Sequence, residues 1–182
     1  STFQISETLN GPTFDFGSGT PGALYYTTNA TGNSAGGVNL ASGILELRNV
    51  DYLTPETIIF EGGSLVVPAD TQSIWSGNLE VNATSTVRVG QDGQLVLNGN
   101  LLGTGFIAQE GEGTLIMRGE MLTPTTNLLN SSREYAVRAG TLFLDFALNN
   151  GSKLSDNANL RLGGSRRGGT VVLSGGSHDE VV

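Results

Sequence analysis

One short phrase recurs along this chain of 182 residues: a glycine, any residue, leucine or valine, any residue, and then an apolar residue. It reads GALYY, GILEL, GSLVV, GNLEV, GQLVL, GTLIM, GTLFL and GTVVL in turn. Alternation of apolar and other residues inside a phrase indicates a half-buried β-strand, and the glycine suits the turn before it. Copies of one short strand are typical of repeat architectures, in which each unit packs against the next.

The phrase returns at unequal intervals. Its opening residues are Gly22, Gly43, Gly63, Gly77, Gly93, Gly113, Gly140 and Gly169. A further phrase, ANLRL, has Ala158 in the glycine position. Helical repeats stack with a constant length, whereas a β-solenoid accepts insertions at its turns without disturbing the stacked strands. The unequal spacing therefore favours a solenoid with coils of irregular length.

The remaining sequence predicts an ordered, all-β chain. Apolar residues make up 37% and charged residues only 14%, a composition that argues against disorder. Additional short strands are expected at ETIIF (56–60), STVRV (85–89) and EYAVRA (134–139), where β-branched or aromatic residues recur. Glycine and proline interrupt nearly every window, and no apolar pattern of helical period persists.

We expect residues 41–182 to form consecutive coils of a parallel β-solenoid, with residues 1–40 as a less regular β region or capping coil. Inward leucines should form one stack, with successive coils about 4.8 Å apart. The expected members of this stack are Leu45, Leu65, Leu79, Leu95, Leu115 and Leu142. An antiparallel sandwich of short strands also fits the turn signals, but the shared phrase favours the solenoid.

Charge and composition disfavour several classes of partner. The net charge of −8 should repel nucleic acid and anionic lipid surfaces. The absence of cysteine excludes disulfides and thiolate metal sites. No apolar run is long enough to cross a bilayer as a helix, so no membrane insertion of this segment is expected. The opening STFQISE is not a leader peptide, which suggests a processed product or a piece of something longer.

Residues 111–144 resemble the passenger-associated repeat of bacterial autotransporters, G-x-G-T-L-x-L-x-G followed by a turn and x-V-x-x-G-T-L-x-L. The matching residues are Gly111, Gly113, Thr114, Leu115, Met117, Gly119, Val137, Gly140, Thr141, Leu142 and Leu144. The family's short turn is replaced here by the longer EMLTPTTNLLNSSREY. The resemblance covers residues 111–182, with weaker echoes back to about residue 41. It implies a right-handed parallel β-helix, secreted to the bacterial surface as an adhesive, structural or presenting stalk, and it carries no catalytic motif.

Two motifs that suggest chemistry are better explained as turns. GSGTPG (17–22) matches the glycine pattern of dinucleotide-binding loops, but the strand-like ALYYTTN follows it where a helix is required. The single histidine, His178, lies between Ser177 and Asp179. Successive strand residues point to opposite faces, so these three neighbours cannot form a catalytic triad among themselves.

Some β-helical proteins cleave polysaccharides, and this reaction requires clustered acids for acid–base chemistry or for calcium. The acids here are dispersed along the chain. Glu46 and Glu80 occupy the same position of the recurring phrase, so they could stack on one outer face. Stacked like charges are more often a solvated surface than a catalytic pair, and we favour the solvated surface.

Other surface features have both a structural and a functional interpretation. Tyr25, Tyr26 and Trp75 could offer a sugar-stacking surface, or they could pack in the core or at its edge, which we favour. The dibasic SRRGG (165–169) fits an exposed turn, although cleavage or anion contact is an alternative. The sequons at Asn29, Asn82, Asn130 and Asn150 follow from a composition rich in Asn, Ser and Thr.

The sequence therefore offers no catalytic, cofactor-binding or metal-ligating residue. We expect a non-enzymatic extracellular module, secreted or at the bacterial cell surface, that serves in a stalk, adhesin or fibre. The alternative is a carbohydrate-binding or polysaccharide-cleaving β-helix. Expected partners are like chains or neighbouring repeats that stack end to end through added strands, with surface glycans or a host or matrix protein as further candidates.

Overall fold

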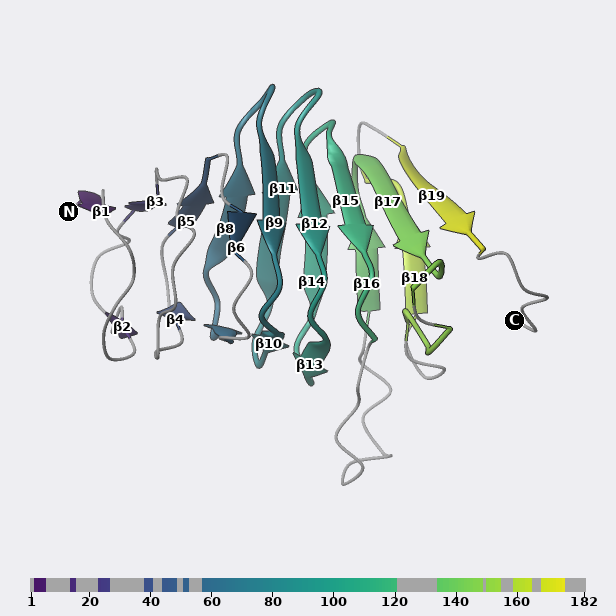
Figure 1. Cartoon of the computed structure of the whole chain (residues 1–182), viewed down its shortest axis with the longest axis horizontal. Coiled ribbons are helices and arrows are strands. Elements are labelled where there is room, and N and C mark those ends of the chain that lie inside the picture. Colours follow the sequence, from purple (N-terminus) through teal and green to yellow (C-terminus); the bar gives the residue numbers. More distant parts are fainter. Residues whose placement is uncertain are drawn as a thin grey trace.

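The structure, a computed structural model, is built entirely of β-strands and turns in its described part, with no helix. It describes residues 2–5, 14–15, 23–26, 38–40, 44–48, 51–52, 57–120, 134–148, 150–154, 159–164 and 168–175. The strands form three sheets, here called A, B and C. Within each sheet the strands follow one another along the long axis of the molecule, with β1 at one end and β19 at the other (Figure 1).

Each sheet collects every second or third strand of the chain. Sheet A contains β1 (Thr2–Ile5), β3 (Ala23–Tyr26), β5 (Ile44–Leu47), β8 (Ser64–Val67), β11 (Ser85–Val89), β14 (Ile107–Glu110), β16 (Glu134–Val137) and β18 (Asn159–Leu162). Sheet B contains β2 (Phe14–Asp15), β4 (Val38–Leu40), β7 (Ile58–Phe60), β10 (Leu79–Val81) and β13 (Leu101–Gly103). Sheet C contains β6 (Asp51–Tyr52), β9 (Gln72–Trp75), β12 (Gln94–Leu97), β15 (Thr114–Met117), β17 (Gly140–Asp145) and β19 (Gly169–Ser174).

The chain passes from sheet A to sheet C, then to sheet B, and back to sheet A, as in β8, β9, β10 and β11. We call one such circuit a coil. Every pairing between the described strands is parallel, which excludes the antiparallel sandwich for this part of the chain. Three parallel sheets visited in rotation fit a parallel β-solenoid.

Strand register gives the length of each coil. Leu65 pairs with Val87 and Val87 with Gln109, so these two coils take 22 residues each. Phe143 pairs with Val172, so the last described step of sheet C takes 29 residues. The additional residues enter between strands, which leaves the strand pairing in register.

Backbone hydrogen bonds connect the coils along the long axis. Gln94 N–H donates to the Thr71 carbonyl at 2.8 Å, and Thr114 N–H donates to the Gly93 carbonyl at 3.0 Å. Thr141 N–H donates to the Gly113 carbonyl at 3.0 Å in the coil that follows. Each coil is therefore bonded mainly to the coil before it and the coil after it.

The core lies between the three sheets and consists of inward side chains that repeat in register. In sheet A one inward row contains Leu45, Leu65, Val87, Gln109 and Val137. In sheet C another contains Ser73, Leu95, Leu115, Leu142 and Val171. Alternation of buried and partly exposed residues along each strand produces these rows.

The expected single stack of six leucines is wrong in its arrangement. All six side chains are buried, at most 2% exposed. They belong, however, to different sheets: Leu45 and Leu65 to sheet A, Leu79 to sheet B, and the other three to sheet C. The recurring phrase fails to mark one sheet because glycine is suited to the corners before all three.

Glycine is required where two coils approach most closely. The corner that follows the strands β9, β12 and β15 of sheet C contains Gly77, Gly99 and Gly119 in successive coils. A Cβ atom added to Gly99 would overlap the carbonyl oxygen of Gly77, and one added to Gly119 would overlap that of Gly99. At the corner from sheet A to sheet C, Asp70 and Asp92 adopt the left-handed conformation with φ of 56°, which aspartate tolerates better than most residues.

Residues before position 41 contribute strands β1 to β4, which continue sheets A and B. β3 pairs with β5 in parallel, and β4 pairs with β7 in parallel. The boundary expected near residue 40 stays a prediction.

Candidate functional site

The outer face of sheet C carries three rows of side chains that lie in register along the axis. The first row is polar and uncharged and contains Gln72, Gln94, Thr114, Thr141 and Thr170. The second is apolar and contains Ile74, Val96, Ile116, Phe143 and Val172. The third follows the strands and contains Ser76, Asn98, Arg118, Asp145 and Ser174. The strands that carry them run side by side in Figure 1.

Exposure differs along the apolar row. Val96 is only 5% exposed, whereas Ile74, Ile116, Phe143 and Val172 are partly exposed. At the N-terminal end of the sheet, the backbone of β6 pairs with β9, with Asp51 opposite Ile74. An apolar row between two polar rows gives the face a regular pattern that repeats with every coil.

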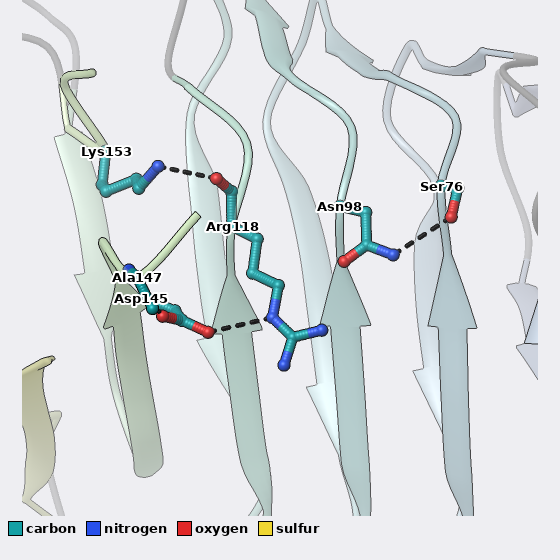
Figure 2. Close-up of polar contacts among 6 residues, drawn as sticks. All are labelled: Ser76, Asn98, Arg118, Asp145, Ala147 and Lys153. Carbon is teal, nitrogen blue, oxygen red and sulfur yellow. Dashed lines mark hydrogen bonds and ion pairs between the residues drawn. The ribbon is translucent and has the colours of Figure 1, made fainter. Parts of the chain in front are cut away.

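Polar bonds along the third row link neighbouring coils (Figure 2). Asn98 Nδ2 donates to Ser76 Oγ at 3.1 Å, and Arg118 Nε donates to Asp145 Oδ2 at 2.9 Å. Partial burial alone would raise the pKa of Asp145. The hydrogen bonds from Ala147 N–H and Arg118, with the charges of Arg118 and Lys153, outweigh burial and lower that pKa below its usual value.

Lys153 is an almost fully buried cation beside this row. Its side chain is 1% exposed, and Nζ donates to the Arg118 carbonyl at 2.6 Å (Figure 2). The ammonium also lies 5.4 Å from the centre of the Phe146 ring, within the range of a cation–π interaction. Phe146, which precedes Lys153 in the sequence, and Leu154, which follows it, both pack against the core. Lys153 therefore links its own coil to the coil that contains Arg118.

The outer face of sheet A is different because it carries charges. Arg88 and Arg138 both bind Glu110, at 2.9 and 3.0 Å, from the coils on either side. The hydrogen bond from Arg88 is the main reason that the pKa of Glu110 lies below its usual value, with Arg138 adding to it. Arg138 also lies 5.9 Å from the centre of the Phe106 ring.

Among the described residues, Gln109 Oε1 and the Tyr135 hydroxyl are buried inside the coils without a hydrogen-bonding partner. Gln109 still donates through Nε2 to the Thr141 carbonyl at 2.8 Å, which ties sheet A to sheet C. Complete burial raises the pKa of the Tyr135 hydroxyl far above its usual value, so this group stays neutral. Sequence reasoning missed Gln109, Tyr135 and Lys153, because no local pattern separates them from surface polar residues.

The expected stacking of Glu46 and Glu80 on one outer face is wrong. Glu46 lies on β5 in sheet A, and Glu80 lies on β10 in sheet B. Each has a local partner instead: Glu46 accepts a hydrogen bond from Arg48, and Glu80 accepts one from Asn82 Nδ2 at 3.0 Å. The shared position in the phrase fixes only that a residue faces outward, and it does not fix the sheet.

The aromatic residues considered for sugar stacking are not equivalent. Trp75 is 2% exposed and belongs to the core, as the favoured interpretation expected. Tyr25 and Tyr26 lie on β3 and pair with Glu46 and Leu47, but their side chains fall outside the described residues. The glycine motif 17–22, His178 and the arginines of SRRGG also fall outside the described part.

Within the described residues, no group of three or more His, Cys, Asp or Glu side chains is arranged to hold a metal ion. The described residues also include no helix that is long and apolar enough to cross a membrane. The regular outer face of sheet C is thus the most distinctive surface that the structure describes. No protein family, curated protein or solved structure matches this chain.

Proposed function

We propose that this chain is a segment of a right-handed parallel β-solenoid that serves, without enzymatic activity, as a structural or adhesive module of a bacterial surface stalk, adhesin or fibre. The observation that carries the proposal is the parallel register of the strands in three sheets, of which A and C extend to β18 and β19 and B to β13. Such an array gives length and rigidity from short repeated units. The resemblance of residues 111–144 to autotransporter passenger repeats supports the handedness and the extracellular location.

The side-chain chemistry supports a mechanical role. Glu110 bridges arginines from the coils before and after it, and Arg118 binds Asp145 of the following coil. Asn100 N–H donates to Asn78 Oδ1, and Glu120 N–H donates to Asn100 Oδ1, both at 2.9 Å. All these bonds join one coil to the next, which resists separation of the coils.

The runner-up, a polysaccharide-cleaving β-helix, is separated by an activity test. Purified protein is incubated with a panel of neutral and anionic polysaccharides, with and without calcium, and the products are followed by chromatography. We expect no release of oligosaccharides. Release that stops when a single Asp or Glu is replaced by its amide would overturn the non-enzymatic assignment and favour the runner-up.

End-to-end stacking through added strands is part of the same proposal. On the last described strands, Leu160, Leu162 and Leu173 occupy inward rows yet are 41%, 53% and 60% exposed. A further coil, from a neighbouring repeat or another copy, would cover them. Because each copy carries a charge of −8, added salt should promote association of copies. Light scattering and negative-stain microscopy across salt concentrations measure this, and an unchanging 18.9 kDa monomer would exclude stacking of copies.

A further inference from the structure

From β9 to β19, the outer face of sheet C carries no net charge, although the chain is strongly acidic. The chain carries a net charge of −8. From Ile74 to Val172, the described residues of the polar and apolar rows contain no charged side chain. The third row contains Arg118 and Asp145, which form an ion pair at 2.9 Å and cancel each other. A neutral surface of this length on an acidic protein suits an uncharged partner.

The same face is periodic. Equivalent side chains repeat once per coil, at the strand spacing of about 4.8 Å, over the five strands from β9 to β19. The surface of a globular partner has no such repeat and would match only a few positions. A polymer that lies along the axis can repeat a similar contact at each coil whose apolar side chain is partly exposed, which leaves out only Val96 of this row, and many weak contacts then add up.

The residue types fit neutral sugars. The first row supplies amide and hydroxyl groups, such as Gln94 and Thr114, which both donate and accept hydrogen bonds as sugar hydroxyls do. The apolar row supplies Ile116 and the ring of Phe143, against which the C–H faces of a pyranose can pack. The two rows lie next to each other on every strand, so a sugar could use both at once.

We propose that the outer face of sheet C binds an extended neutral polysaccharide, which lies along the solenoid axis with its rings on the apolar row and its hydroxyl groups against the Gln and Thr row. A second copy of the chain is a poorer occupant, because two chains that each carry a net charge of −8 repel each other at low salt. An anionic polymer is repelled for the same reason. The binding is additional to the structural role and does not depend on it.

The test is affinity electrophoresis of the folded chain in native gels that contain hydroxyethylcellulose, xyloglucan or galactomannan, with polygalacturonate as the anionic comparison. We expect at least one neutral polymer, and not polygalacturonate, to retard the protein. Ile116→Glu places a charge in the middle of the apolar row. Its matched control is Val66→Glu, an equally charged change on the outer face of sheet A.

We expect Ile116→Glu to weaken retention by about tenfold or more, whereas Val66→Glu leaves it within about twofold. Thr141→Val removes one hydroxyl from the face and should weaken retention by about threefold, with Thr86→Val on sheet A as its control. Circular dichroism melting curves establish that each variant is folded before it is compared.

Three outcomes would overturn the proposal. The first is that no neutral polymer retards the wild-type chain at any concentration tested. The second is that the changes on sheet A weaken retention as much as those on sheet C. The third is preferential retention by polygalacturonate, or self-association that Ile116→Glu abolishes, since either result identifies a different occupant. Cleavage of the polymer is a separate readout that bears only on the non-enzymatic assignment.

Discussion

Replacing Leu115 with alanine tests most directly the core that lies between the three sheets. Leu115 is 1% exposed and lies in an inward row of sheet C between Leu95 and Leu142. The change removes three carbon groups, and at about 0.8 kcal/mol for each, transfer alone costs about 2.4 kcal/mol. The neighbouring leucines are held by the backbone bonds of their own strands, so they cannot fill the space, and the residual cavity raises the expected loss to about 3–5 kcal/mol.

Leu173→Ala is the matched control, because it deletes the same atoms from an inward row where the side chain is 60% exposed. We expect it to cost less than about 1 kcal/mol, since little apolar area leaves water when this residue folds. The measurement is urea unfolding followed by Trp75 fluorescence and by circular dichroism. Trp75 is the only tryptophan and is 2% exposed, so it reports on the core directly.

Both probes are needed because repeat proteins can unfold in parts, and free energies are compared only where the two transitions coincide. Where the transitions differ, the shift of the circular dichroism midpoint ranks the two variants. The reasoning fails if Leu173→Ala is as destabilising as Leu115→Ala. It also fails if Leu115→Ala lowers the free energy of unfolding by less than about 1 kcal/mol.

Two further predictions use a corner and an ion-pair network. Gly99→Ala should lower the free energy of unfolding by about 2 kcal/mol or more, because the new Cβ overlaps backbone atoms of Gly77. Gly168→Ala, with nothing within 4 Å of the new Cβ, should stay within about 0.5 kcal/mol; similar losses for both would show that the close approach is wrong. The pKa of Glu110 is lowered in the folded chain, so its stabilising contribution is present at neutral pH and is lost as pH falls below the usual value of 4.5. Thermal melting from pH 7 to pH 3 should therefore show a smaller loss for Glu110→Gln than for the wild type, and equal losses would contradict the assignment.

The direction of side chains within a strand could be predicted from the sequence. The third residue of the recurring phrase faces inward wherever its side chain is described, as Leu65 on sheet A, Leu79 on sheet B and Leu115 on sheet C show. Side chains of a strand alternate between its two faces with a period of two residues. This alternation depends only on the strand itself, so the local sequence pattern predicts it.

The sheet to which each strand belongs could not be predicted in this way. That assignment depends on how many residues each corner uses, and corners differ between coils, as the steps of 22 and 29 residues show. Glu46 and Glu80 illustrate the result, since the same phrase position places them on different sheets. The recurring phrase predicts where a turn and a strand occur. The sheet to which that strand belongs follows only from the register between neighbouring coils.

The burial of Lys153 also could not be predicted from the residues around it in the sequence. Its burial depends on Arg118 and Phe146, and the bond to the Arg118 carbonyl joins residues 35 positions apart. A lone lysine in a glycine- and asparagine-rich stretch is normally solvated, so the sequence around it gave no signal. The polar and apolar rows on the outer face of sheet C could not be predicted either, because they depend on the register between strands of different coils.

The direction of the backbone bonds between coils determines how the molecule would respond to force. These bonds lie along the long axis, so a pull on the two ends loads the interfaces between coils in series. The interface that breaks first would open alone, and the coils would then open one after another. A coil of 22 residues that opens releases about 70 Å of chain once its own rise is subtracted. A force across the axis instead loads all the bonds of a strand pair in shear at once. A stalk built in this way would yield in steps when stretched and would stay stiff when pushed from the side.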